Sequence, residues 1–312
     1  MAQEGEKMDT IAAQDAPDLE SVGDESKDGE RKDSGKVNWF AEIRGLALML
    51  LGVLAFHSIL AKPFYIPSAS MVPNLMVGDR LVVSKYPYGW NWSSISFQPL
   101  ARGEWRIAPS TPEYGDIVVL MPPEGADQVT EYIKRVVALP GDRIALVDGR
   151  IILNGEEIPR EIVPAVQIPT EHPNLCDGRD CLEAYALYRR RLEDGSEVYE
   201  PPTYRETLPN GASFLVVDHM PDILDNYAEI TIPDGHVFVM GDNRDHSADS
   251  RAPLAGRGLD GPIPMSDIGG RAEFITFSLD GRASWNPFSW YSALRGDRAW
   301  TSLRPALDDG DN

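Results

Sequence analysis

An apolar run of seventeen residues without a formal charge, residues 45–61, limits what this chain can fold into more than any other feature. At about 1.5 Å per residue, a helix of this length reaches about 26 Å, which is near the shortest span of a bilayer. Residues 39–41 extend the apolar stretch upstream, and Arg44 can stretch its charged end toward the headgroups. A buried core helix would carry a polar stripe, and a cleaved signal peptide would begin near the N-terminus. We therefore expect one uncleaved transmembrane anchor over residues 38–61.

The charges on either side of this run predict how the anchor is oriented. Residues 25–44 hold five lysines and arginines, whereas residues 62–81 hold two. The positive-inside rule then places the N-terminus in the cytoplasm and residues 62–312 beyond the membrane.

The N-terminal segment is strongly acidic. Residues 1–37 carry eleven acidic side chains against five basic ones and almost no large apolar residues. Such a stretch buries too little apolar surface to offset its ordering entropy, so we expect a disordered cytoplasmic tail. The whole chain of 312 residues has a formal net charge of −20. Because nucleic-acid binding needs a basic face, no nucleic-acid partner is expected.

Beyond the anchor, the sequence is a series of short β-branched segments bounded by Gly, Pro or Asp. Few windows longer than ten residues show helical periodicity, so we expect a mainly β protein with an antiparallel barrel or sandwich-like core. A β insertion over residues 156–229 is expected to divide this core into residues 62–155 and 230–280, followed by a C-terminal extension, 281–312. The expected strands are residues 80–86, 115–121, 131–139, 143–147, 150–155, 213–218, 236–241 and 272–279.

The two cysteines, Cys176 and Cys181, enclose the turn-forming tetrapeptide Asp-Gly-Arg-Asp. Disulfides persist outside the cytoplasm, so we expect a small structural disulfide here. Three other interpretations stay open: two free thiols, half of a metal site together with His172, or a redox pair. No second cysteine pair completes a zinc set, and the usual redox motif is shorter by two residues.

Two serines, Ser68 and Ser70, follow the apolar run within ten residues and raise the question of a nucleophile. The sequence has no G-x-S-x-G elbow, no H-E-x-x-H and no phosphate-binding G-x-x-x-x-G-K-[ST]. A Ser-His-Asp triad stays open, because its members need not be close in sequence. We expect no metal and no cofactor.

Lys134 is the candidate base for one of these serines. It lies in E-Y-I-K-R-V-V-A-L-P-G-D, where strand alternation puts Tyr132, Lys134 and Val136 on one face. Desolvation among apolar neighbours disfavours an ammonium ion and lowers the lysine pKa. A neutral amine can then take a proton from a serine hydroxyl. A solvent-facing strand lysine is the alternative.

Three motifs follow the anchor in order: P-S-A-S-M-V-P-N-L-M-V-G-D, E-Y-I-K-R-V-V-A-L-P-G-D and M-G-D-N-R-D-H-S-A-D-S-R. Together they resemble the signature boxes of type I signal peptidases of Gram-negative bacteria, which are membrane-anchored serine proteases with a Ser/Lys dyad. The resemblance covers residues 62–155 and 230–280, and it implies an antiparallel β core with an active site on the side that faces the membrane. Alone, the third motif would also fit a polar loop or a calcium loop, although its Asp and Asn spacing is not that of an EF-hand.

The resemblance implies a role for each matching residue. Ser70 corresponds to the nucleophile and Lys134 to the general base. The hydroxyl of Ser68 and the backbone N–H of Ser70 would form the oxyanion hole. Ser247 corresponds to the residue that orients the lysine amine. The positions that match shallow apolar pockets for small substrate side chains are Phe64, Ile66, Val119, Tyr132 and Ile133, and those that match a supporting ion pair are Asp249 and Arg251.

The function implied is the removal of N-terminal signal peptides from exported preproteins, by cleavage after Ala-x-Ala-like sites. The expected partners are these preproteins, the lipid bilayer and the secretion machinery. The expected location is the inner membrane, as a single-pass protein with a periplasmic catalytic domain. Two alternatives are a specialised Ser/Lys processing peptidase of the conjugation type and an inactive anchored binding module. A self-cleaving repressor is disfavoured, because no DNA-binding helix-turn-helix precedes the core.

An aromatic stretch within residues 87–112 appears longer than in the best-known members of that family, which also have two spans. It holds Trp90, Trp92, Phe97 and Trp105 among glycine, prolines and serines. Some of these rings are expected in the core. Because Trp favours the membrane interface, we also expect part of this stretch to dip into the headgroup region.

Overall fold

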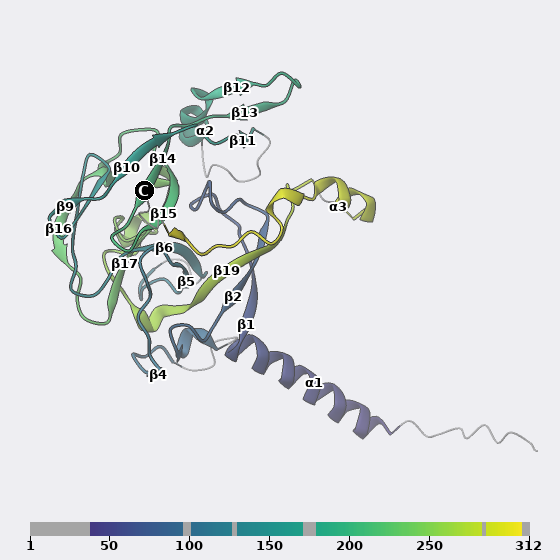
Figure 1. Cartoon of the computed structure of the whole chain (residues 1–312). Coiled ribbons are helices and arrows are strands. Elements are labelled where there is room, and N and C mark those ends of the chain that lie inside the picture. Colours follow the sequence, from purple (N-terminus) through teal and green to yellow (C-terminus); the bar gives the residue numbers. More distant parts are fainter. Residues whose placement is uncertain (1–37, 96–100, 127–129, 171–178, 283–284, 308–312) are drawn as a thin grey trace, which may run out of the picture. The chain divides into compact units, whose positions relative to one another are not determined.

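The computed structural model describes residues 38–95, 101–126, 130–170, 179–282 and 285–307 (Figure 1). The expected acidic tail, residues 1–37, lies outside the described residues, as do Phe97 and Cys176. Helix α1 (Trp39–Ile59) forms over the apolar run, where Leu, Ala and Met have good helix propensity. Among the described residues, α1 is the one helix long and apolar enough to cross a bilayer, and none of its residues is buried.

The largest sheet has seven strands, and all neighbouring strands in it are antiparallel. The long strand β19 shifts register against both of its neighbours, β2 and β5, and such bulges bend and twist a sheet. In spatial order the strands are β1 (Ala61–Tyr65), β2 (Asp79–Ser84), β19 (Ile268–Ser278), β5 (Ile117–Leu120), β6 (Tyr132–Ala138), β17 (His236–Met240) and β18 (Ile263–Pro264).

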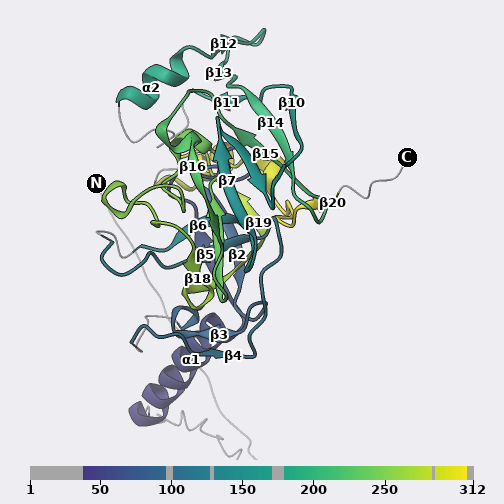
Figure 2. The same ribbon diagram turned by 90° about the vertical axis from the view of Figure 1, so that its left-hand side faces the viewer.

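The remaining strands form four smaller antiparallel sheets (Figure 2). Two have four strands: β16 (Tyr227–Thr231), β7 (Arg143–Val147), β8 (Arg150–Leu153) and β9 (Glu156–Glu157); and β10 (Arg160–Val163), β14 (Thr203–Thr207), β15 (Ala212–Val217) and β20 (Ala306–Leu307). One has three: β11 (Ile168–Pro169), β13 (Glu197–Tyr199) and β12 (Arg189–Arg191). The last is the hairpin of β3 (Trp90–Asn91) and β4 (Arg106–Ile107).

Short helices complete the fold. The α-helices are α2 (Arg179–Ala186) and α3 (Pro287–Ala293). The single-turn 3₁₀ helices are η1 (Trp92–Ser94), η2 (Ile223–Asp225), η3 (Arg244–His246), η4 (Leu254–Gly256), η5 (Met265–Asp267) and η6 (Gly296–Arg298).

The core lies on both faces of the seven-stranded sheet. Val118 and Val136 point into one apolar cluster, whereas Ile117, Val119 and Ile133 point into another. A third cluster joins β6 and β17 to the two four-stranded sheets. Strands buried on both faces are expected to read as continuous apolar runs, which is why the segment Ile-Val-Val-Leu of β5 lacks alternation.

The prediction of a mainly β fold is confirmed, and all eight expected strands are present within a few residues of their expected bounds. Residues 156–229, the expected β insertion, hold strands β10 to β15, and they also contain helix α2, which lies beside β11 and β13 (Figures 1 and 2). Its Cys181, Ala184 and Tyr185 follow helical spacing, a pattern too short to stand out in the sequence. Residues 46–312 form one compact unit, so the insertion packs with the core.

Candidate active site

The candidate nucleophile lies in the loop that joins β1 to β2. Ser70 is 7% exposed, and its neighbours Met71 and Val72 are fully buried in apolar clusters. Because these side chains pack into two different apolar clusters, they fix the loop and hold the Ser70 hydroxyl in one place.

Lys134 reaches this hydroxyl from the middle of β6. Its Nζ lies 2.9 Å from Ser70 Oγ, and its side chain is buried. Burial lowers the pKa of Lys134 to about 8, although the carboxylates of Asp249 and Asp242 oppose that shift. About one Lys134 side chain in ten is therefore a neutral amine at pH 7, far more than for a lysine with the usual pKa, and it is in hydrogen-bonding contact with a hydroxyl. This is the arrangement that a serine nucleophile and its general base require.

The other two serines of the expected site lie close by. Ser68 is half-buried, with its Oγ 3.5 Å from Ser70 Oγ. Ser247 lines the same cavity, but its buried hydroxyl has no hydrogen-bond partner among the described residues. Ser247 therefore makes no hydrogen bond to the Lys134 amine here, and the orienting role that the resemblance implied for Ser247 stays a prediction.

Two buried ion pairs flank Lys134. Arg251 binds Asp249 through two contacts of 2.9 Å, and Asp249 Oδ2 also accepts a hydrogen bond from the backbone of Gly241. On the opposite side of β6, Arg135 binds Asp242 through two contacts of 2.7 Å. The expected pair of Asp249 and Arg251 thus exists, and the second pair was not anticipated from the sequence.

Gly241 allows these elements to meet. A Cβ atom at this position would lie 2.5 Å from the carbonyl oxygen of Ser70 and equally close to Ser247 Cβ. Only glycine lets β17 pass so close to the nucleophile loop.

A cavity of about 670 Å³ opens at the dyad and contains Ser68, Ser70 and Lys134 in its wall. Three of the five residues expected to bind substrate line it: Phe64, Tyr132 and Ile133. Ile66 and Val119 do not line it, because both are buried in the apolar cluster against which Phe64 packs. The sequence missed further parts of the wall, which come from residues 222–224 and from Ala252, Pro253 and Arg257.

A second buried lysine, Lys85, has a lowered pKa like that of Lys134 but does not line the cavity around Ser70. Lys85 is 3% exposed, and burial lowers its pKa to about 8, against a raising effect of Glu131. Lys85 is not among the residues that line the cavity around Ser70. A lowered pKa therefore does not identify the base, whereas the 2.9 Å contact does.

One cluster of three carboxylates in the described part of the chain has the spacing of a cation site. Oxygen atoms of Asp218, Asp225 and Asp245 lie within 4.8 Å of one another. Arg160 already binds Asp218 at 2.6 Å, and burial raises the pKa of Asp245 to about 7. The Arg160 guanidinium and the raised pKa of Asp245 both lower the negative charge of these three carboxylates near neutral pH, and we assign no metal to them.

Only one of the two cysteines of the expected disulfide lies within the described residues. Cys181 lies in α2 and does not carry a free thiol. Its predicted partner, Cys176, lies outside the described residues, so the pairing stays a prediction.

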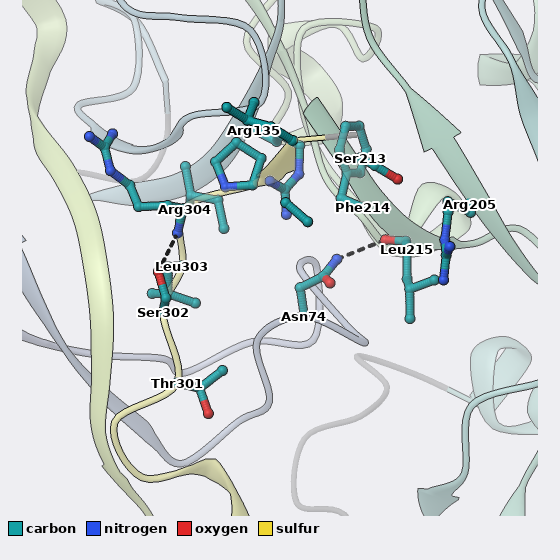
Figure 3. Close-up of a pocket in the computed structure, with 14 residues that line it drawn as sticks. Asn74, Arg135, Arg205, Ser213, Phe214, Leu215, Thr301, Ser302, Leu303 and Arg304 are labelled. Atoms are coloured by element: carbon teal, nitrogen blue, oxygen red, sulfur yellow. Dashed lines mark hydrogen bonds between the residues drawn. The ribbon is translucent and has the colours of Figure 1, made fainter. Parts of the chain in front are cut away.

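A separate cavity of about 420 Å³ lies between β15 and the C-terminal segment, residues 301–307 (Figure 3). Neither Ser70 nor Lys134 lines it. Asn74 in its wall donates hydrogen bonds to Leu215 O at 2.7 Å and to Asp242 Oδ2 at 2.8 Å. It therefore ties the end of the nucleophile loop to β15 and to the carboxylate that binds Arg135.

Comparison with known proteins supports one family. The model of the family described as "Signal peptidase, peptidase S26" matches residues 37–277. The signal peptidase I of Rickettsia canadensis (strain McKiel) is 33% identical over 247 residues, which are 76% of this chain and 79% of that one. The signal peptidase I of Rickettsia akari (strain Hartford) is 31% identical over 265 residues, 82% of this chain and 84% of that one. A crystal structure of a signal peptidase I from Enterococcus faecalis V583 aligns with a TM-score of 0.26 and 18% identity, covering 52% of this chain and 97% of that chain.

Proposed function

The chain belongs to the signal peptidase family, peptidase S26, and we propose that it is a membrane-anchored serine endopeptidase that removes N-terminal signal peptides from exported preproteins. The observation that carries this proposal is the contact of 2.9 Å between Ser70 Oγ and Lys134 Nζ inside a cavity open to substrate. The names of the curated relatives support the substrate class. The apolar helix α1 supports the anchor.

The chemistry follows from the two side chains. Neutral Lys134 takes the hydroxyl proton of Ser70 as Oγ attacks the scissile carbonyl carbon, and the carbonyl oxygen becomes an oxyanion. The backbone N–H of Ser70 and the hydroxyl of Ser68 donate hydrogen bonds to that oxygen. The ammonium group of Lys134 then protonates the departing amine as the peptide bond breaks, leaving an ester on Ser70. Water, deprotonated by the same lysine, hydrolyses the ester.

The shape of the cavity predicts a preference for small side chains next to the cut. Phe64 and Ile133 are held in or against the core, so the wall they form cannot retreat from a bulky substrate side chain. We expect cleavage after Ala-x-Ala, and we expect a phenylalanine in place of the last alanine to lower kcat/KM by about 100-fold or more through steric exclusion. The full-length chain in detergent, a preprotein and mass spectrometry of the products test both points. Equal cleavage of the two substrates would contradict the proposed pocket.

In the aromatic stretch, the side chains that are free to contact lipid are not all those expected from the sequence. Trp92 is 6% exposed, and its Nε1 donates to Asp267 in the core, so Trp92 does not reach a membrane. Trp90 donates from its Nε1 to Ile59 O, which places the β3–β4 hairpin at the end of α1. In this hairpin, Trp105 is 38% and Ile107 is 60% exposed. We propose that these two side chains, rather than Trp92, enter the headgroup region.

Replacing both Trp105 and Ile107 by serine should lower processing of a membrane-embedded preprotein at least about threefold, because apolar contact with lipid is lost. Cleavage of a soluble peptide should change little. Ile162, which is 85% exposed on the distant strand β10, provides the matched control Ile162→Ser. Equal loss on both substrates would show that the hairpin supports the fold and does not contact lipid.

The expected orientation rests on the charge of the flanks alone. With the N-terminus in the cytoplasm, Ser70 would work on the periplasmic side of the inner membrane, within the reach of a signal peptide that has crossed it. Cysteine labelling at positions before and after α1 in intact cells tests this orientation.

A further inference from the structure

The insertion over residues 156–229 contacts the nucleophile loop through an apolar cluster. The cluster joins side chains of the insertion to side chains on both sides of Ser70. Its buried members are Ala69, Val72 and Val77 from the loop, and Ile168, Tyr185 and Tyr199 from the insertion.

Tyr185 is the central side chain of this cluster. It projects from α2, is 0% exposed, and stacks on the imidazole of His246 with ring centroids 5.3 Å apart. It also contacts the rings of His219 at 4.6 Å and Tyr199 at 5.5 Å. Burial raises the pKa of Tyr185, so its hydroxyl keeps its proton throughout the working pH range.

The hydroxyl of Tyr185 meets a fully buried amide, that of Asn243. Asn243 Nδ2 donates one hydrogen bond to Tyr185 Oη at 3.1 Å and a second to Ala69 O at 3.1 Å. The backbone N–H of Asn243 donates to Ser70 O, also at 3.1 Å. Asn243 therefore holds the carbonyl groups of the peptide before and of the peptide after the nucleophile's α-carbon.

The first of these contacts bears directly on the oxyanion hole. Ala69 C=O and Ser70 N–H belong to the same planar peptide group, and in a trans peptide they point in opposite directions. Fixing the Ala69 oxygen on Asn243 thus fixes the direction in which the Ser70 N–H points. That N–H is the backbone donor that the proposed mechanism requires.

We propose that Tyr185 and Asn243 are positioning residues for the oxyanion hole, and that the insertion sets the efficiency of catalysis through them. This inference rests on the proposed function, in which the Ser70 N–H stabilises the oxyanion. Tyr185 acts as the second acceptor for the Asn243 amide. Without it, one Nδ2 hydrogen is buried without an acceptor, and Asn243 Oδ1 already has no partner among the described residues. The side-chain amide of Asn243 is then no longer fixed in its present orientation, and Ala69 O loses its side-chain donor.

The substitution Tyr185→Phe removes the hydroxyl and leaves the ring stack in place. We expect kcat for a soluble signal-peptide substrate to fall about tenfold, with KM unchanged within about twofold, because the lost interaction is made to the transition state. The affinity for a substrate-like peptide boronic acid, which forms a tetrahedral adduct on the serine, should fall by a similar factor. Tyr199→Phe is the matched control, since it deletes a hydroxyl from the same cluster that is not bonded to Asn243.

The outcomes separate this inference from the function on which it rests. Wild-type activity that depends on Ser70, a loss specific to Tyr185→Phe and a matching loss of boronate affinity support the positioning role. If both phenylalanine variants lose activity equally, or if neither does, the insertion only packs against the loop and the inference is wrong. A rise in KM with unchanged kcat would overturn it as well. A wild-type protein that leaves preproteins intact would instead refute the proposed function. All rates are compared below the melting temperature of each variant, so that a loss of stability does not imitate a loss of the contact.

Discussion

Replacing Ser70 or Lys134 by alanine is expected to lower kcat/KM for a preprotein by at least about 10³-fold, because each change removes one half of a unit that works only as a pair. Ser70→Ala leaves no nucleophile. Lys134→Ala leaves a hydroxyl with no base, since the 2.9 Å contact to Nζ is its link to a proton acceptor. The double variant should be no slower than either single variant. Processing assays with the purified full-length chain in detergent measure all three.

The matched control for this prediction is Lys85→Met. Lys85 is buried, and burial lowers its pKa to about 8, as it does for Lys134. Methionine keeps its length and apolar stem, so activity should stay within a few-fold of wild type. If Lys134→Ala retained substantial activity, or if Lys85→Met lost as much as Lys134→Ala, the assignment of the base would be wrong.

The second large effect is expected at Gly241. In Gly241→Ala the new methyl group would lie 2.5 Å from Ser70 O, so the nucleophile loop or β17 must shift. The shift that relieves this overlap moves Ser70 away from Lys134. A misplacement of a reacting group by about 1 Å costs about 100-fold in rate. We expect at least that loss in kcat, together with a lower melting temperature.

Gly296→Ala is the control for this change, because a Cβ at Gly296 meets nothing within 4 Å and the residue lies in η6, away from the cavity. It should leave both rate and melting temperature unchanged. A fully active Gly241→Ala protein would show that the loop can move without harm, and it would contradict the account of a fixed nucleophile.

The strands could be predicted because their signal is local. Each is a short run of β-branched side chains between turn residues, and this pattern needs no knowledge of the partner strand. The order of strands in the seven-stranded sheet is different, since it pairs β2 with β19, which lie far apart in sequence. Nothing in either segment identifies the other.

The candidate site was predictable to the extent that its residues lie inside recognisable motifs. Ser68, Ser70, Lys134 and Ser247 come together around one cavity, as the resemblance implied. The depth of a side chain was not predictable. Ile66 and Val119 are in the core and Trp92 is buried, because burial depends on which strands cover a segment and not on the segment itself.

The contact between α2 and the nucleophile loop illustrates the same limit. Tyr185 and Asn243 are joined by a hydrogen bond across the insertion boundary, and no spacing rule connects them. Asn243 lies inside the third motif, yet the sequence gives no reason to prefer it over its polar neighbours. Its role becomes visible only when its amide is seen against Ala69 O.

The central claim, that neutral Lys134 activates Ser70, is tested most directly by the pH dependence of kcat/KM in wild type and in Lys85→Met. Burial lowers the pKa of Lys134 to about 8, and the base works only when it has lost its proton. The rate should therefore rise about tenfold per pH unit below that pKa and level off above it. Because Lys85 is not the base, both proteins should show the same profile. A rate that is flat from about pH 6 to pH 10, or a midpoint that disappears when Lys85 is replaced, would contradict the account.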